Sequence, residues 1–462
     1  MLHRASDTLA AKLPFFYGYL MIPLAMMLQI TTSPGQTFAF SAFTPSFRQA
    51  FAMSDSHLTF AYMLGTFLAA IPLTIVGPLS DRFGLKGLST LAVLGVSLTC
   101  WLASFATGWW NLLLVFFLLR LLGQGSLSLL GGNAISMWFR NRIGRVSALM
   151  SIGTAFAFAW VPGMIRNSID AIGWRDTYQV IAVLVAATTL PLVLIFFRNR
   201  PEEIGQSVDG GHTHRTPTQN DKTPLAGSQQ PTRTEPDAIA IAIETEPSMT
   251  FAQAIRTPAF WILAVTNLAW ALIGTGVVFY LYIICQQRGF EVDVPSNLFK
   301  TFGLCMLAGQ LGGGVLADFV RLNRMLGLGT AMLCLGISSL LVGRSETTLQ
   351  AFAVFFGGGQ GLLLAVGSVV WVRYYGRQSL GSIRGSAWCA TVAGSGCGPL
   401  LMGMSLDRYG SFDPAIKLFL VTMGILAVAS WFAINPSKVL NPEPSLIVPD
   451  KDLIVPGKEI DG

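Results

Sequence analysis

The chain has 462 residues, of which 52% are hydrophobic and 12% are charged, and its formal net charge is +6. A soluble domain carries roughly twice this charged fraction, so the composition excludes an ordinary soluble protein and indicates a chain surrounded mostly by lipid. The positive charge follows from the placement of Lys and Arg in loops, described below, and requires no nucleic-acid partner.

Roughly twelve apolar stretches are long enough to cross a bilayer, which takes about 20 helical residues. They are centred near Ile30, Ala69, Gly95, Gln124, Ala155 and Val185, and then near Asn267, Leu307, Leu333, Gly358, Ala393 and Ile425. The six cysteines lie in or at the ends of these stretches, without the close pairs of a metal site, and are interpreted as small packing residues. We predict an all-α membrane protein with twelve transmembrane helices in two six-helix bundles.

The composition changes abruptly after residue 200, where Pro, Thr, Gln, Asp and Gly replace the apolar runs. Such a segment buries too little apolar surface to fold alone, so it is predicted to be a flexible linker between two halves. The predicted divisions are an N-terminal segment 1–14, a bundle 15–200, a linker 201–256, a second bundle 257–434 and a tail 435–462.

Basic residues are spread unevenly over the loops. Loops on the side of the N-terminus are rich in them, as at Arg142, Arg198 and Arg321, whereas the opposite loops mix both signs, as at Arg175 and Asp176. Because basic loops stay on the cytoplasmic side, both termini are predicted to be cytoplasmic. The pattern predicts a multi-pass protein of the cell (inner) membrane.

The two halves repeat the same short signatures. The run Gly77–Asp81 recurs as Gly314–Asp318, and Gly123-Gln124-Gly125 recurs as Gly359-Gln360-Gly361, each about 237 residues later. The same separation relates two further pairs, Pro162 with Pro399 and Gly173 with Gly410. A duplicated unit in an apolar chain is typical of transporters built around a central site between two bundles.

The first repeated run carries a family resemblance. The segment Gly77-Pro78-Leu79-Ser80-Asp81-Arg82-Phe83-Gly84-Leu85-Lys86 resembles the Gly-x-x-x-Asp-Arg-x-Gly-x-Lys/Arg signature of the major facilitator superfamily, between the second and third spans. The resemblance implies a conformational gate made of Gly77, Asp81, Arg82, Gly84, Lys86 and, in the second half, Asp318. Asp81 is expected near the N-terminus of the eleventh helix, whose dipole favours an anion, and Asp318 in a weaker matching role against the fifth helix. These contacts would form only when the cytoplasmic side is closed.

Three further segments resemble the monocarboxylate porters and the oxalate:formate antiporters. They are Trp138–Arg145, Gly173–Tyr178 and the pair Gly398–Gly403 with Asp407–Phe412. The resemblance implies a monocarboxylate as substrate. Members of that branch often carry a charge in the eighth or eleventh helix, whereas here Lys300 and Arg384 lie only near the ends of those spans.

Arg120 is the only charged residue well inside a predicted span, in a fourth helix expected over about residues 110–137. A charge at this depth costs at least about 2.5–3.5 kcal/mol unless it faces a cavity and meets a partner. No span contains a deep Asp or Glu, so an anionic substrate could be the counter-ion. Alternatively, Arg120 could bond carbonyl groups at a kink in the first span at Pro34-Gly35-Gln36.

Gln124 lies four residues after Arg120, on the same helix face, and Gln360 is its repeat counterpart. These two amides could flank a central cavity from opposite halves. Alternatively, each could form a hydrogen bond to a neighbouring helix, where the adjacent glycines allow close packing. Further candidate substrate-binding residues are Gln36, Asn267, Tyr280 and Tyr62.

The predicted function is secondary active transport of a small organic anion, a monocarboxylate above all, by alternating access, with a proton or counter-anion as a candidate coupled ion. The alternatives are a facilitator-fold transporter of a sugar or drug-like compound, and a non-transporting membrane sensor. An enzyme is not predicted, because the chain lacks a His-rich metal set, a Gly-x-Ser-x-Gly elbow and a phosphate-binding Gly loop with a Lys. The expected partners are therefore the lipid bilayer and the substrate, with no cofactor and no metal.

Overall fold

The computed structural model describes residues 15–139, 142–210, 249–376 and 379–436. Every regular element in these ranges is a helix. Ten helical segments are long and apolar enough to cross a membrane, in agreement with the predicted all-α membrane fold. A broken first segment (Gly18–Thr31 and Thr37–Phe51) and α12 (Asp293–Leu316) lie where the other two spans are expected, and neither is among the ten.

The helices of the first half follow the predicted order of spans. They are α2 (Gly18–Thr31), η1 (Ser33–Gly35), α3 (Thr37–Phe51), α4 (Asp55–Phe83), α5 (Leu85–Ala103), α6 (Trp109–Leu118), the π-helical η2 (Leu119–Leu127), α7 (Ser128–Trp138), α8 (Ile143–Ile172) and α9 (Trp174–Phe196). The first span is thus α2, η1 and α3, and the fourth is α6, η2 and α7. Two short turns, η3 (Pro201–Ile204) and η4 (Val208–Gly210), follow α9.

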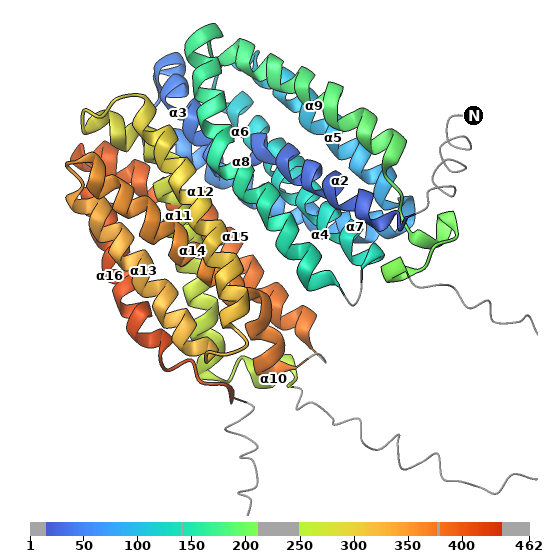
Figure 1. Ribbon diagram of the computed structural model, residues 1–462. Helices are drawn as coiled ribbons and strands as arrows, with labels where there is room; N and C mark the ends of the chain where they lie inside the picture. The colour runs from blue at the N-terminus through green and yellow to red at the C-terminus, as the bar shows by residue number, and fades with distance from the viewer. Residues whose placement is uncertain (1–14, 140–141, 211–248, 377–378, 437–462) are drawn as a thin grey trace, which may run out of the picture.

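The second half begins with the short α10 (Phe251–Ala254), whose first turn is closed by a capping box between Thr250 and Gln253. Its spans are α11 (Pro258–Gln287), α12, α13 (Leu322–Val342), α14 (Glu346–Tyr375), α15 (Leu380–Tyr409) and α16 (Asp413–Ser430). Figure 1 shows the two groups of helices side by side, α2 to α9 in blue to green and α11 to α16 in yellow to red.

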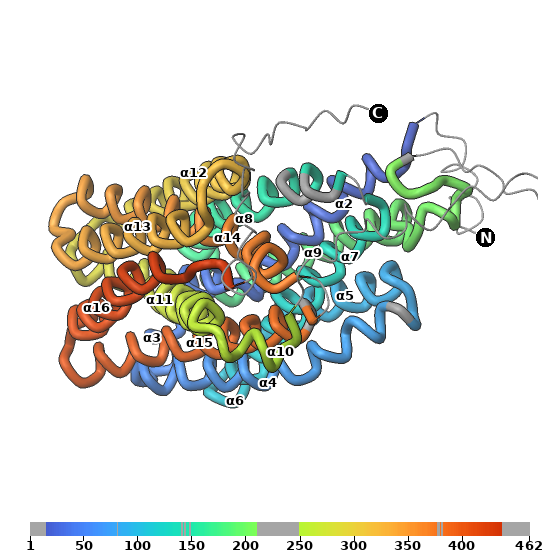
Figure 2. Tube along the Cα trace, turned by 90° about the horizontal axis from the view of Figure 1, so that it is seen from below, coloured from blue at the N-terminus to red at the C-terminus, as the bar shows by residue number. Residues whose placement is uncertain are grey.

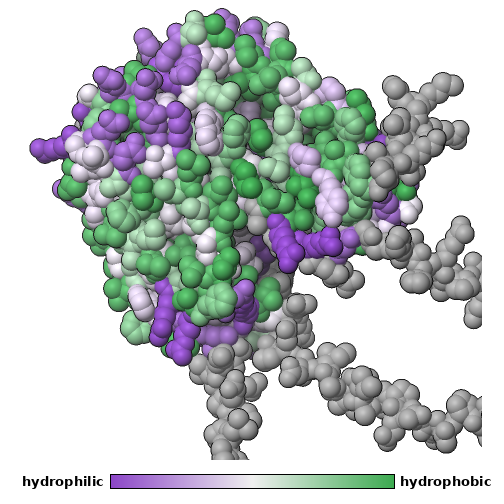
Figure 3. Space-filling view, in the orientation of Figure 1, coloured by the Kyte–Doolittle hydropathy of each residue, from purple (hydrophilic) through white to green (hydrophobic). Residues whose placement is uncertain are grey.

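Apolar side chains cover the flanks of both groups. Large hydrophobic residues such as Ile71, Val183 and Ile425 are more than half exposed. In Figure 3 hydrophobic residues cover much of the middle of the molecule, and hydrophilic ones gather toward its ends. This distribution suits helices whose sides face lipid and whose ends face water.

The two halves lie against each other at one end only. We call the side where α3 ends and α4 begins the outer side, and the opposite side, where α2 begins and α9 ends, the inner side. The halves meet through α3 with α11, α4 with α15 and α8 with α12 (Figure 2). Figure 1 shows that they separate toward the inner side.

A group of polar contacts, which we call the outer closure, joins the halves at the outer end. The carboxylate of Asp407, at the end of α15, accepts hydrogen bonds from the backbone N–H of Asp55 (3.0 Å) and of Ser56 (2.7 Å). These are the first N–H groups of α4, which have no partner within the helix and lie at the positive end of its dipole. Asp55 itself pairs with Arg48 at 3.0 Å, and its carbonyl accepts from the hydroxyl of Tyr280 at 3.3 Å.

Aromatic and small residues continue this contact below the outer closure. Phe158 of α8 packs edge-on against Phe302 of α12, with ring centroids 4.5 Å apart. Gly303 of α12 lies so close to α8 that an added methyl group would be 2.8 Å from the Cβ of Ala159. Small residues at such positions let helix backbones approach, as is common between membrane helices.

The loop signature lies on a tight turn between α4 and α5. Gly84 has φ +79°, a conformation that residues with a side chain rarely adopt. The side-chain oxygen of Asn199, just after α9, accepts a hydrogen bond of 2.8 Å from the backbone N–H of Lys86. The turn is therefore anchored within the first half.

Close backbone packing between α11 and α15 generates a stability prediction. A methyl group added at Gly398 would overlap the carbonyl oxygen of Leu272 and lie 3.0 Å from the backbone nitrogen of Gly276. Because backbone atoms cannot rotate away, Gly398→Ala should destabilise the protein by about 1–3 kcal/mol. The measurement is the melting temperature of purified protein in detergent.

The matched control is Gly385→Ala on the same helix, where an added methyl group meets no atom within 4 Å. This variant should melt at or slightly above the wild-type temperature, because Ala favours a helix over Gly. Equal melting of the two variants would contradict the packing described here.

Candidate functional site

A cavity of about 530 Å³ lies between the two halves. The first half contributes side chains from α2, α3, η2, α7 and α8, and the second from α11, α12, α14 and α15. Its polar lining consists mainly of amides and hydroxyls, namely Gln29, Gln36, Gln124, Gln310, Gln360, Thr32, Thr37, Ser128, Ser151, Thr154, Thr275, Thr391 and Ser395. Its aromatic lining is Phe38, Phe158, Trp270 and Trp388. Among the described residues that line it, Arg120 is the only charged one.

The broken first span and the π-helical turn η2 fit closely together. A methyl group added at Gly35 would overlap the carbonyl oxygen of Leu119, and one added at Gly123 would lie 3.3 Å from that of Thr32. The bend at η1 therefore packs against the backbone of the fourth span, directly beside Arg120. π-helical turns inside α-helices are frequent at functional sites, because they re-aim the side chains that they carry.

Arg120 is 5% exposed and bonded to hydroxyls from both halves. Its Nε donates to the hydroxyl of Thr66 on α4, and its Nη2 donates to the hydroxyl of Ser395 on α15, both at 3.2 Å. The guanidinium carbon lies 5.1 Å from the ring centroid of Tyr62. Among the described residues, the buried Nη1 has no hydrogen-bond partner.

These contacts bear on the two roles considered for Arg120. Among the described residues, the partners of Arg120 are hydroxyls and an aromatic ring, and they do not include the carbonyl groups at residues 34–36. A cation–π contact contributes about 0.5–2 kcal/mol, which is less than the cost of burying a guanidinium without a counter-ion. In the described part of the chain, the charge is thus left without an acidic partner.

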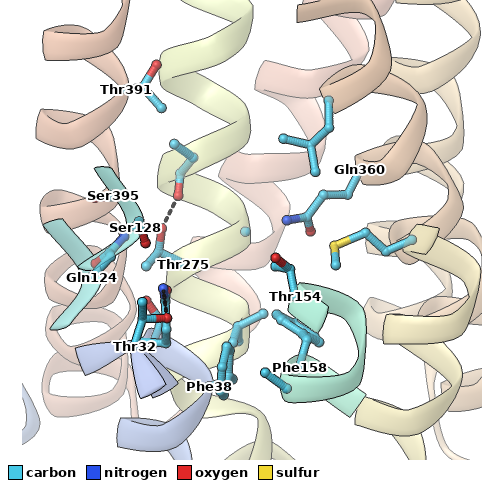
Figure 4. A pocket seen from close by; sticks show the side chains of 18 of the residues that line it. Thr32, Phe38, Gln124, Ser128, Thr154, Phe158, Thr275, Gln360, Thr391 and Ser395 are labelled. Atoms are coloured by element: carbon cyan, nitrogen blue, oxygen red, sulfur yellow. Dashed lines mark hydrogen bonds between the residues drawn. The ribbon is translucent and has the colours of Figure 1, made fainter. Parts of the chain in front are cut away.

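Gln124 and Gln360 lie on opposite walls of the cavity (Figure 4). Gln124 is beside Ser395 on one wall, and Gln360 is beside Thr154 and Phe158 on the other. The carbonyl oxygen of Gln360 is buried and has no hydrogen-bond partner among the described residues. The repeated Gly-Gln-Gly signature thus contributes one amide from each half to a single cavity.

The remaining candidate substrate-binding residues lie in different parts of the structure. Gln36 lines the cavity, and its side-chain nitrogen donates to the hydroxyl of Thr32 at 3.1 Å. Tyr62 is fully buried beneath Arg120, with its hydroxyl 2.8 Å from that of Thr37, and Tyr280 belongs to the outer closure. Asn267 is half-buried on α11. The latter three are not among the residues that line the cavity.

Several lining residues were not singled out from the sequence. Gln310 follows Gly309 in an apolar stretch and is followed by Leu311 and Gly312, so it lacks the Gly-Gln-Gly pattern of Gln124 and Gln360; a search for any amide deep in a span would have found it. Ser395, Thr275 and Trp270 gave no such signal, because small hydroxyls and tryptophans are common in membrane helices on any face.

The residues expected to form a gate lie at the inner side. Arg82 is exposed and lies over the ring of Phe83 at 5.4 Å, and the side chain of Asp81 is outside the described part. Asp318 pairs with Arg373 of α14, in its own half, at 2.7 Å. Among the described residues, the expected contact of Asp318 with the fifth span is not seen, and the halves are apart on this side (Figure 1).

Comparison with known proteins places these features in one family. A model of the Major Facilitator Superfamily matches residues 24–309. The chain is 22% identical over 312 residues to the uncharacterized MFS-type transporter YhjX of Escherichia coli strain K12, covering 66% of this chain and 68% of that protein. It is 22% identical over 372 residues to the MFS transporter asaE of Aspergillus flavus, covering 79% and 75%.

A solved structure shares the fold. The structure of a bacterial homolog of the human lysosomal transporter Spinster, in an inward-facing and unoccupied conformation, matches with a TM-score of 0.65 at 13% identity. The match covers 90% of this chain and 97% of that one. Since the family model also spans well over half of the chain, this chain belongs to the Major Facilitator Superfamily of membrane transporters.

Proposed function

We propose that the transporter carries a small organic anion, such as a monocarboxylate, and that Arg120 binds its negative charge. The observation that supports this is the charge of the cavity: Arg120 is the only charged residue among its described lining. A guanidinium that is 5% exposed, with one nitrogen unpaired, is stabilised by an anion that enters the cavity.

The geometry of Arg120 suits a carboxylate. Its planar fork presents parallel N–H groups that match two carboxylate oxygens, and the hydroxyls of Thr66 and Ser395 hold that fork in place. Ser395 belongs to the second half, so an anion at this site would bind where the halves meet. The likeness of Gly173–Tyr178 and Asp407–Phe412 to monocarboxylate porters points to the same class of substrate.

The coupled ion is proposed to travel with the substrate or against it. Because the described lining has no Asp or Glu, a cavity carboxylate that binds and releases a proton is not supported. A proton carried on the substrate carboxylate, or exchange for a second anion, needs no such group.

Arg120 variants test the anion site. Arg120→Gln should weaken carboxylate binding at least about tenfold, because a hydrogen bond to a charged group contributes about 1.5–3 kcal/mol. Arg120→Lys keeps the charge but loses the planar guanidinium group, so its affinity for a carboxylate should lie between those of Arg120→Gln and the wild type. Binding is measured by ligand-induced shift in melting temperature over a panel of carboxylates, sugars and cationic drugs, with uptake into proteoliposomes as the functional readout.

The control is Ser386→Ala on α15, whose hydroxyl is bonded to the carbonyl of Ile383 and does not line the cavity. It should bind as wild type does. Unchanged carboxylate binding in Arg120→Gln would remove the anion from the proposal, and a response to sugars or cationic drugs alone would favour a transporter of those solutes. A protein that binds a carboxylate without moving it would be a sensor.

We further propose that two gates alternate: the outer closure, and the signature Gly77, Asp81, Arg82, Gly84 and Lys86 with Asp318 at the inner side. Asp407→Ala removes the acceptor for the first N–H groups of α4 and should shift the protein toward the outward-open state. Asp81→Asn removes an anion whose contact with a helix N-terminus is worth about 0.3–1 kcal/mol, and should shift it toward the inward-open state.

Hydrogen–deuterium exchange can follow both shifts. Asp407→Ala should speed exchange at the outer end of α4 and slow it at the inner ends of α4 and α8, and Asp81→Asn should do the reverse. Asp407→Asn keeps an acceptor oxygen and should change exchange less than Asp407→Ala. Changes in the same direction for Asp81→Asn and Asp407→Ala would refute opposed gates.

The inner side is proposed to face the cytoplasm of the cell (inner) membrane, with the bundles 15–200 and 257–434 joined by a cytoplasmic linker. The beginning of α2, the end of α9, α10 and the end of α16 all lie on this side (Figure 1). Reporter fusions near Thr218 and in the C-terminal tail, both outside the described residues, should therefore both give a cytoplasmic signal. An external signal from either fusion would overturn this orientation.

A further inference from the structure

We propose that the transported anion is held at two points, with its carboxylate at Arg120 and a neutral hydrogen-bonding group at a second site formed by Gln360 and Thr154. This inference rests on the proposed anion transport and narrows its substrate class. The substrate would be an organic anion that carries a hydrogen-bond donor, a hydroxyl or an amide N–H, at the end of the molecule remote from its carboxylate.

The second site has the features of an unfilled polar contact. The side-chain carbonyl oxygen of Gln360 is buried and unpaired, and neither the side-chain nitrogen of Gln360 nor the hydroxyl of Thr154 has a hydrogen-bond partner among the described residues. Figure 4 shows that these two side chains point toward each other from α14 and α8. An acceptor that is buried without a partner is unfavourable, and a ligand group that donates a hydrogen bond to it would remove this penalty.

The backbone that carries Gln360 is fixed in position. A methyl group added at the neighbouring Gly361 would overlap the carbonyl oxygen of Met306 on α12, and one added at Gly359 would lie 2.8 Å from that of Gly329 on α13. The amide of Gln360 is therefore carried by a helix, α14, that packs closely against both α12 and α13. A rigid support of this kind favours a defined contact over an adaptable one.

The two polar sites are separated across the cavity. Figure 4 places Ser395, which accepts from Arg120, on the wall opposite Gln360. Phe38 and Phe158 lie along one side of the space between them, and Val278 and Met306 also line the cavity. A substrate with a polar group at one end, an apolar middle and a carboxylate at the other end would match this lining. A 2-hydroxy acid would not, because it carries both polar groups at the same end.

Because Gln360 and Thr154 belong to opposite halves, a group bonded to both would also link those halves. The same is true of an anion at Arg120 and Ser395. A substrate of this class would therefore touch both halves at both of its ends.

Two matched pairs of probes test the inference: phenylacetate with 4-hydroxyphenylacetate, and hexanoate with 6-hydroxyhexanoate. Within at least one pair, the hydroxylated member should bind the wild-type protein about five- to tenfold more tightly, as expected for one hydrogen bond. In Gln360→Leu and in Thr154→Val this difference should fall to less than about twofold, while binding of the unsubstituted acid is kept. Thr154→Ser retains the hydroxyl and should retain the difference.

A stability readout separates this role from a structural one. Without ligand, Gln360→Leu should melt at or above the wild-type temperature, because it removes a buried polar atom that has no partner. If Gln360 served only to hold helices together, the variant would melt lower and the preference for the hydroxylated probe would persist.

The outcomes distinguish this inference from the proposed function. Equal affinity within both pairs, no binding of any of the four acids, or an unchanged preference in Gln360→Leu would overturn the second site. Full binding of both members of a pair by Arg120→Gln would instead overturn the proposed anion site.

Discussion

A buried guanidinium with no carboxylate partner among the described residues is the constraint around which this cavity is organised. The close fit of Gly35 against Leu119 places the bend of the first span beside a π-helical turn, and that turn carries Arg120. Hydroxyls of Thr66 and Ser395 and the ring of Tyr62 orient the charge, and none of them neutralises it. Since a lone charge at this depth is costly, the proposed substrate anion would supply the missing negative charge.

The outer closure and the cavity both follow from the way in which the two halves are arranged. Where Asp407 caps the start of α4, the halves are held together, and farther from that contact they separate around the cavity. Helix ends suit such a contact, because their free N–H groups and dipole attract a carboxylate strongly only at short range. A modest displacement of α15 relative to α4 would break the contact, which fits alternating access in a membrane transporter.

The chemistry of the lining has a consequence for substrate choice. Amides and hydroxyls give hydrogen bonds in either direction, whereas a single Arg sets the sign of the charge. The proposed second site at Gln360 and Thr154 adds a requirement for a remote polar group. Affinity for an anion and preference among anions would then depend on different residues, which makes the two separable by mutation.

Much of the fold could be predicted from the sequence. Apolar length and the repeated Gly-x-x-x-Asp signature report local properties, namely membrane-spanning helices and a tight turn, so the fold and the family followed directly. The depth of Arg120 and the Gly-Gln-Gly repeat also raised cavity walls on the fourth and tenth spans as one of two alternatives, since depth along a helix can be counted in residues.

Sequence alone determined the fold, the duplicated architecture and the presence of one deep positive charge, because each depends on residues close together in the chain or at a constant repeat. Tertiary structure decided that Tyr280 lies in the outer closure, that Tyr62 supports Arg120 from below, and that Ser395 reaches Arg120 from the other half. These facts depend on which helix faces touch across the two bundles. A hydroxyl or a tyrosine looks the same in the sequence whether it faces a cavity, a neighbouring helix or lipid.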